Sequence, residues 1–205
     1  MISRRVILGG AGAALLLSGC ADGSDEPVVY LGEGDGFHGT RVEEGPALPE
    51  VALTDQHGQE FNLASSPTTP VVMVFFGYTN CPDVCPGILA DMATARRRLD
   101  PADAEKVSLI LVTTDPARDT AEVLGEYLVR VDENFIGLTG DLEQIIAAGQ
   151  QLGIAIDEGK ELPSGGYEVD HSSQILAFDD QRRMAMVWSQ PSIADMRDDL
   201  ERLIS

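Results

Sequence analysis

An apolar run leads directly into a pair of cysteines in Val71-Val72-Met73-Val74-Phe75-Phe76-Gly77-Tyr78-Thr79-Asn80-Cys81-Pro82-Asp83-Val84-Cys85-Pro86. The apolar residues at 71–76 predict a buried strand, and the apolar residues that recur at helical spacing from 88 to 99 predict a helix. Cys81 and Cys85 therefore lie at the corner where a strand passes into a helix. Residues four apart on a helix are separated by just over one turn, so both sulfurs can project from one face and converge.

Two converging sulfurs suit a soft metal ion or a disulfide bond. The backbone N–H groups and the positive dipole at the start of a helix favour the thiolate, which is the form that binds metals and attacks disulfides. The alternative is a structural disulfide or two inert core cysteines. We favour a reactive pair because the cysteines lie at a helix start and are flanked by prolines.

Strand and helix patterns alternate outward from this corner, and the predicted fold class is α/β. The expected strands cover two short segments within 51–63, then 71–76, 107–112, 135–138, 173–178 and 184–188. The expected helices cover 88–99, 120–131, 141–152 and a final segment from 192, with a polar loop at 157–166. This order predicts a mixed central sheet with helices on both faces and an N-terminal β-hairpin extension, a layout that resembles a thioredoxin-like domain.

The first residues are typical of an export signal. Arg4 and Arg5 precede a short apolar stretch that ends in Leu17-Ser18-Gly19-Cys20, which resembles a lipobox. This resemblance implies a prokaryotic protein with a signal peptide at 1–19 that is cleaved before Cys20, which becomes the lipidated N-terminus. A retained transmembrane anchor is the alternative, and the sequence leaves Sec and twin-arginine export open. A flexible acidic tether is expected at 20–45, before a domain at 46–205. Both interpretations place this domain at the extracytoplasmic face of the membrane.

The charge of the chain excludes several kinds of partner. Its 34 acidic and 14 basic residues give a formal net charge of −20. A surface of this charge repels nucleic acids and anionic lipid headgroups, so we expect no nucleic-acid binding.

His171 is a candidate third ligand for a metal at the cysteines. It lies in Tyr167-Glu168-Val169-Asp170-His171-Ser172-Ser173, where a loop runs into an expected strand. Two thiolates and one imidazole form a soft set of low coordination number that suits Cu(I), and this set can accept Cu(II) with further donors. Zinc remains an alternative, although it favours a fourth ligand.

Several motifs in this order resemble the Sco/SenC family. They are 53–58, the cysteine segment from Phe76 to Pro86, Thr114-Asp115-Pro116-Ala117-Arg118-Asp119-Thr120, Gly137-Leu138-Thr139-Gly140 and Val169-Asp170-His171-Ser172-Ser173. The resemblance covers roughly residues 46–204. It implies a membrane-tethered copper chaperone with a thioredoxin-like fold, in which Cys81, Cys85 and His171 match the copper ligands. The implied partner is the copper-bearing subunit of cytochrome c oxidase or another copper chaperone.

Two positions depart from the family pattern. Asn80 stands where the family often has a histidine, just before the first cysteine. The final hairpin, Asp179-Asp180-Gln181-Arg182-Arg183, lacks the glycine that the family commonly has, so we expect a different turn. Neither change removes a predicted ligand.

Other polar and sulfur-bearing residues have simpler interpretations. Asp83 can steer a cation or only favour the helix dipole. Asp115, Arg118 and Asp119 can form a polar cluster near the site, although we favour a turn and a helix cap. The remaining candidates are more typical of packing, turn or linker positions than of ligands; they are Met184, Met186, Trp188, Tyr167, His57 and His38.

The sequence thus predicts an extracytoplasmic copper chaperone that need not be an enzyme. The rival hypothesis is a thiol–disulfide oxidoreductase, or a peroxiredoxin-like reductase, that uses Cys81 and Cys85 to maintain the cysteines of a respiratory partner. Exchange of the thioredoxin type usually uses two residues between the cysteines, whereas three are present here. Such a catalyst also has no need of His171.

Overall fold

The computed structural model describes residues 28–30, 36–82, 84–161, 167–171 and 173–205, with side chains at 36–82, 84–156 and 173–205. The leader at 1–19 and the predicted lipid-bearing Cys20 lie outside these residues. Within them, no helix is both long and apolar enough to cross a membrane.

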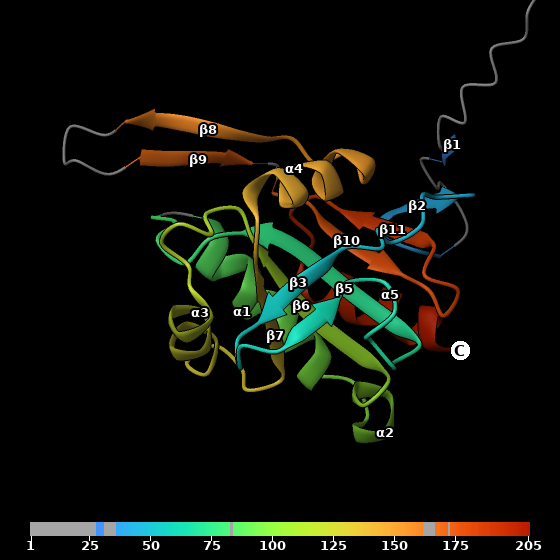
Figure 1. The fold of residues 1–205 in the computed structure, drawn as a ribbon. Helices are drawn as coiled ribbons and strands as arrows, with labels where there is room; N and C mark the ends of the chain where they lie inside the picture. The colour runs from blue at the N-terminus through green and yellow to red at the C-terminus, as the bar shows by residue number, and fades with distance from the viewer. Residues whose placement is uncertain (1–27, 31–35, 83, 162–166, 172) are drawn as a thin grey trace, which may run out of the picture.

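A mixed sheet of nine strands forms the centre of the molecule (Figure 1). The strands β5, β6 and β7 are parallel, and every other pairing in the sheet is antiparallel. In spatial order the strands are β1 (Val28–Tyr30), β2 (Thr40–Glu43), β11 (Met184–Trp188), β10 (Ile175–Phe178), β5 (Val71–Gly77), β6 (Val107–Thr113), β7 (Phe135–Thr139), β3 (Ala52–Asp55) and β4 (Glu60–Asn62). The predicted mixed sheet and the hairpin within 51–63 are confirmed.

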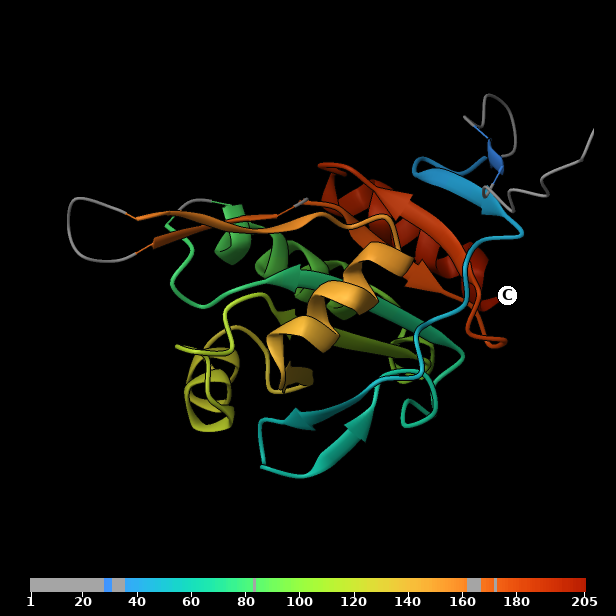
Figure 2. The same ribbon diagram turned by 45° about the horizontal axis from the view of Figure 1, so that its top comes forward.

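Helices cover both faces of this sheet, as predicted. The helices α1 (Val84–Arg97) and α5 (Ile193–Ile204) pack against each other on one face, and α4 (Leu142–Gln151) lies across the other (Figures 1 and 2). The helix α3 (Ala121–Leu128) packs against β7, and the short α2 (Pro101–Ala104) was not predicted. The side chains of Thr120, Asp141 and Ser192 accept hydrogen bonds from the first turns of α3, α4 and α5, so polar caps set these three helix starts.

The polar segment at 157–166 was predicted to be a loop, and this prediction is wrong for its first part. Residues Ile156–Glu161 form β8, which pairs antiparallel with β9 (Tyr167–His171) in a separate two-stranded ribbon. The ribbon projects beyond the main sheet (Figure 1). The ribbon is separate from the main sheet, and its polar residues at 157–161 lack the alternating apolar pattern that predicts a half-buried strand.

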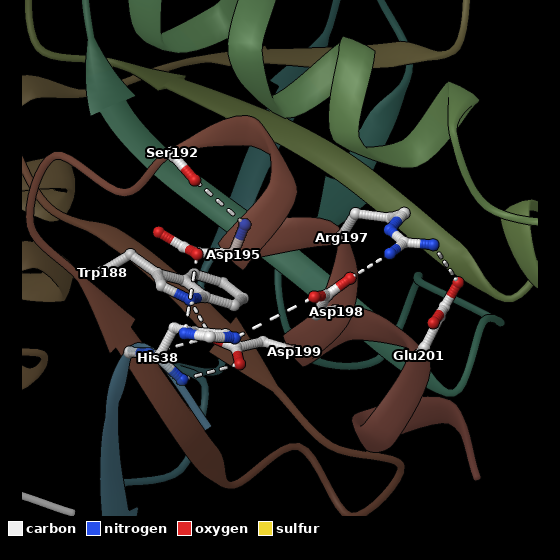
Figure 3. Close-up of polar contacts among 9 residues, drawn as sticks. His38, Trp188, Ser192, Asp195, Arg197, Asp198, Asp199 and Glu201 are labelled. Carbon is white, nitrogen blue, oxygen red and sulfur yellow. Dashed lines mark hydrogen bonds and ion pairs between the residues drawn. The ribbon is translucent and has the colours of Figure 1, made fainter. Parts of the chain in front are cut away.

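Two strands lie within the predicted tether at 20–45, because β2 pairs with β11 and β1 pairs with β2 to form the edge of the main sheet. Behind this edge, the buried carboxylate of Asp199 accepts hydrogen bonds from three donors: the backbone N–H groups of His38 and Gly39, at 2.8 and 2.9 Å, and Nε1 of Trp188, at 2.7 Å (Figure 3). The imidazole of His38 also lies 3.5 Å from the carboxylate of Asp195. His38 therefore belongs to the folded domain, and its interpretation as a linker residue is wrong, although its imidazole is about half exposed to solvent.

The hairpin without a glycine turns at Arg182, which has a φ of 61° in the left-handed region that favours glycine. Its guanidinium donates hydrogen bonds to the carbonyl oxygens of Thr69, Pro67 and Asp179. These contacts hold the turn against the loop before β5 and offset the strain of the backbone.

We expect Asp199→Asn to lower the free energy of unfolding by about 1–3 kcal/mol, because the amide group replaces one acceptor oxygen and leaves a buried donor without a partner. Urea denaturation followed by Trp188 fluorescence measures this change. The neighbouring Asp198→Asn is the matched control, since this side chain is partly exposed, and we expect it to change stability by under about 0.5 kcal/mol. Equal effects of the two variants would contradict the role given to Asp199.

Candidate metal centre

The central strand β5 ends four residues before Cys81. All seven of its residues are buried, so its position in the sheet is fixed from both faces. At its end, a Cβ on Gly77 would approach the Phe75 ring to 2.5 Å, which explains the glycine at this exit. The carbonyl of Gly77 accepts a hydrogen bond from the backbone N–H of Thr114 at 2.9 Å, and this bond joins the loop after β5 to the loop after β6.

The two cysteines flank the start of α1. Cys81 precedes the helix in a turn where its N–H bonds to the carbonyl of Tyr78, and Cys85 is the second residue of the helix. The predicted position of both cysteines at the strand-to-helix corner is confirmed, but the helical spacing used to align their sulfurs does not apply at Cys81. The sulfurs nevertheless meet, because the Cys85 N–H donates to the Cys81 Sγ at 3.5 Å and the two side chains interact directly. Both residues are thiols.

Burial distinguishes the two thiols. Cys85 is fully buried and Cys81 is partly exposed. Burial, and then its hydrogen bond with Cys81, raise the pKa of the Cys85 thiol above its ordinary value, against an opposing contribution from the Tyr78 backbone. The sequence favoured the thiolate at both positions because of the helix start. Burial can shift a pKa by several units, whereas a helix terminus contributes less than about one, so burial dominates at Cys85.

A buried carboxylate holds the loop that precedes Cys81. Asp119 accepts hydrogen bonds from the backbone N–H of Thr79 at 2.9 Å, from the Thr79 hydroxyl, and from the Thr113 hydroxyl at 2.7 Å. Hydrogen bonds to an ionised group are stronger than neutral ones. The loop before Cys81 is thereby fastened to the end of β6.

The turn and helix cap favoured for Asp115, Arg118 and Asp119 describe only part of this segment. The carbonyl of Asp115 does form the expected turn, since it accepts from the N–H groups of Arg118 and Asp119, but the cap of α3 is Thr120. The carboxylate of Asp115 pairs with Arg118, and that guanidinium lies 5.8 Å from the centre of the Tyr78 ring. Together with the bonds of Asp119 to Thr79, these contacts place the polar cluster beside the cysteine loop.

Tyr127 lies in the helix expected at 120–131, and it is a neighbour of the site that the sequence analysis did not single out. Burial raises the pKa of its hydroxyl, and the charges of Cys85, Cys81 and Asp119 raise it further, in that order. The oxygen is buried without a hydrogen-bond partner in the described structure. The one signal in the sequence that could have identified Tyr127 was its polar hydroxyl on a helix stripe that is otherwise apolar and includes Leu124 and Leu128.

The backbone brings the chain that follows His171 to the start of α1. His171 is the last residue of β9 and pairs with Ile156. Two residues later, Ser173 lines a groove with Val84, Gly87 and Ile88 of α1. The side chains of His171 and Asp83 lie outside the described residues. Among those that are described, no third His, Cys, Asp or Glu joins Cys81 and Cys85 in a group able to hold a metal ion.

The other candidates fall where their simpler interpretations put them. Met184 and Met186 are buried in the core, as predicted. Trp188 is also buried, where its indole N–H bonds to Asp199. His57 is exposed in the turn between β3 and β4. The side chain of Tyr167 lies outside the described residues.

Comparison with known proteins links this site to one family. The SCO1/SenC family model matches residues 43–205. A putative copper-binding protein from Stutzerimonas stutzeri is 37% identical over 129 residues, which cover 63% of this chain and 62% of that protein. The mitochondrial protein SCO2 of Saccharomyces cerevisiae is 33% identical over 131 residues, which cover 62% of this chain and 42% of that protein. The matched regions thus span less than two thirds of either relative.

Solved structures share the whole domain. ScoI from Bradyrhizobium japonicum, determined with copper bound, superposes with a TM-score of 0.67 at 30% identity, covering 78% of this chain and 98% of ScoI. The solution structure of apo Sco1 from Thermus thermophilus gives a TM-score of 0.72 at 32% identity, covering 82% of this chain and 96% of Sco1. The predicted thioredoxin-like fold is thereby confirmed.

We expect an alkylating reagent to modify Cys81 well before Cys85 at pH 7–8, because Cys81 is accessible and the pKa of Cys85 is raised. Reaction at Cys85 should keep accelerating at a pH well above that at which an ordinary thiol is already deprotonated, because the pKa of Cys85 is raised. Peptide mass spectrometry after timed iodoacetamide treatment measures both rates, and Cys81→Ser and Cys85→Ser chains confirm the assignment. Equal rates at neutral pH would contradict the asymmetry.

Proposed function

Because this chain belongs to the SCO1/SenC family, we propose that it is a copper chaperone for the assembly of cytochrome c oxidase. In this proposal Cys81, Cys85 and His171 bind the copper cargo, as Cu(I) and also as Cu(II) with further donors. The recipient is the copper-bearing subunit of the oxidase or another copper chaperone. The chain need not catalyse a reaction, since its task is to hold copper and release it.

The observation that carries this proposal is the contact between the two thiols at the end of β5, in a fold shared with copper-bound ScoI. Two thiolates are soft donors that favour Cu(I). The proposed third ligand is supported by the course of the backbone, since Ser173 lies beside the first turn of α1 only two residues after His171. Two residues of extended chain span roughly 7 Å, a distance that a histidine side chain helps to bridge.

We further propose that the domain is held at the extracytoplasmic face of the membrane by a lipid on Cys20. The lipobox-like segment Leu17-Ser18-Gly19-Cys20 supports this assignment. In this proposal the link between Cys20 and the main sheet is shorter than the predicted tether at 20–45, because β1 and β2 lie within that segment and pair with the sheet.

A second candidate function, thiol–disulfide exchange, is supported by the unequal burial of the two cysteines. An exposed sulfur can attack a partner's disulfide, and a buried sulfur can then resolve the mixed disulfide. The two functions can coexist, because copper loading requires the reduced pair.

We expect the reduced mature chain to bind one copper ion with sulfur ligands. Cys81→Ser and Cys85→Ser should each abolish tight binding. His171→Ala should weaken binding by more than the roughly 10–100-fold that loss of an outer-shell partner costs. Anaerobic titration against a Cu(I) chelator measures affinity, and His57→Ala is the matched histidine control. X-ray absorption that finds no sulfur at the bound copper would refute the site.

The His171→Ala variant also separates the two functions in cells. A chaperone should lose oxidase activity at limiting copper and regain part of it when copper is added, while its thiols still cycle. A thiol reductase should be indifferent to this change and require only the cysteines. Oxidase activity and the thiol redox state are measured in the same strains. Normal oxidase assembly at limiting copper would favour the reductase.

Anchoring is tested by mass spectrometry of the mature protein, which should begin at a lipidated Cys20. Cys20→Ser should move the protein from the membrane fraction to the released fraction, because a single residue carries the lipid. An intact leader or an unmodified Cys20 would reject the lipoprotein assignment.

A further inference from the structure

A second groove lies between the turn after β3 and the C-terminal half of α3, and its volume is about 500 Å³. We refer to it as the α3 groove. It shares no lining residue with the cysteine loop or with the groove beside Ser173, so it is separate from the proposed copper site. The turn after β3, the helix α3 with its C-cap, and the start of β7 line it through Gln56, His57, Gly125, Glu126, Val129 and Phe135.

The walls of the α3 groove are held together by hydrogen bonds. The Nε2 of Gln56 donates to the carbonyl oxygen of Phe135 at 3.0 Å, and the Oε1 accepts from the N–H of Gly137 at 3.0 Å. Both bonds join the turn after β3 to β7, and β3 itself pairs with β7 at Thr54 and Asp55. The groove is thus formed in the free protein, so a partner binds it without first having to order its walls.

Two features of this helix are not explained by packing within the described chain. Val129 is 65% exposed, which is more than any other large apolar side chain of the described residues. Gly125 lies inside α3, where glycine is unfavourable, and its φ is not in the left-handed region. A Cβ at this position would lie 3.5 Å from its nearest neighbour, the carbonyl oxygen of Gln56, which is an ordinary contact. The fold therefore does not require this glycine, and its missing side chain widens the groove.

The charge of the α3 groove indicates what kind of partner it fits. Its lining includes Glu126, Asp132 and Glu133, and no lysine or arginine. The side chain of Asp132 is nearly buried and pairs with Arg97 at 2.6 Å, so its charge is compensated. Glu126 and Glu133 are exposed and form no ion pair among the described residues. Two unpaired carboxylates beside an exposed valine are complementary to an apolar side chain with cationic groups next to it.

Other kinds of ligand fit this groove less well. Its carboxylates repel nucleic acids and anionic lipid headgroups. Within the described residues, no group of His, Cys, Asp and Glu side chains is able to hold a metal ion, so the carboxylates do not form a cation site. The amide of Gln56 already uses both of its ends within the fold, which leaves few polar groups to orient a small molecule.

We propose that the α3 groove is a docking site for a segment of a partner protein in which lysine or arginine residues flank an apolar side chain. The apolar side chain packs against Val129 and fills the space beside Gly125, while the cationic groups pair with Glu126 and Glu133. Apolar contact then lies at the centre of the interface and the ion pairs lie at its rim. This inference goes beyond the proposed copper chaperone function and does not depend on it, because the two sites share no residue.

The test uses the mature chain and a fluorescein-labelled peptide of three Lys-Leu-Ser-Lys repeats. Fluorescence anisotropy should detect binding that weakens as salt is added. Val129→Ser should weaken binding about fivefold, because an apolar contact is lost. The double change Glu126→Gln with Glu133→Gln should weaken it by about three- to tenfold, since each exposed ion pair contributes little. Gly125→Leu should weaken it by about tenfold or more, because its side chain fills the groove.

Matched controls come from exposed residues that do not line the groove. Val123→Ser changes another exposed valine of α3 and should leave the affinity unchanged. Glu122→Gln with Glu143→Gln removes the same total charge elsewhere and should also leave it unchanged. Equal losses in the two charge variants would mean that net charge alone attracts the peptide, and this would overturn the docking site.

A peptide with serine in place of leucine tests the apolar contact and should bind about fivefold more weakly. A wild-type chain that binds the two peptides equally, or binds neither, would also overturn the docking site. Circular dichroism checks that each variant is folded, and a folded Gly125→Leu chain with wild-type affinity would contradict the proposed position of the segment. Cys81→Ser removes a proposed copper ligand and should bind the peptide as the wild type does, so failure of the copper function and failure of the docking site are distinguishable.

Discussion

The position of the cysteine loop depends on the buried carboxylate of Asp119. Its three hydrogen bonds join Thr79, just before Cys81, to Thr113 at the end of β6. Hydrogen bonds to a charged group contribute about 1.5–3 kcal/mol each, so this junction is strong relative to the stability of a typical domain. The bond between Gly77 and Thr114 joins the same two loops through the backbone. The position of Cys81 is therefore determined by these hydrogen bonds to the end of β6 and not by the loop alone.

This arrangement gives the two sulfurs different properties. Cys81 lies in the turn before α1, where it is partly exposed to solvent, and Cys85 is buried in the core. For a protein that passes copper to a partner, one exposed ligand offers a point of entry, while a buried ligand keeps the metal from leaving in the absence of that partner. The same asymmetry also suits disulfide exchange. The chemistry of this corner therefore fits both functions, and the proposed ligand His171 is the feature that distinguishes them.

The regular part of the fold could be predicted because its residues bury apolar faces. The strands β5, β6 and β7 follow from apolar runs, and the starts of α3, α4 and α5 follow from their polar caps. Three features escaped prediction because apolar patterning does not encode them. They are the ribbon of β8 and β9, which pairs apart from the main sheet, the strand β2 between β1 and β11, and the turn at Arg182, which depends on contacts with Thr69 and Pro67 far away in sequence.

By itself, the sequence determined that two thiols stand where a buried strand meets a helix, since local patterning and spacing suffice for that conclusion. It also supplied the motifs that point to the family. Only the tertiary structure decided that Cys81 precedes the helix, that burial overrides the helix start at Cys85, and that Asp119 fastens the loop to β6. Burial and hydrogen bonding at each of these residues depend on elements brought together by the β5–β6 pairing, and such contacts have no local signature in the chain.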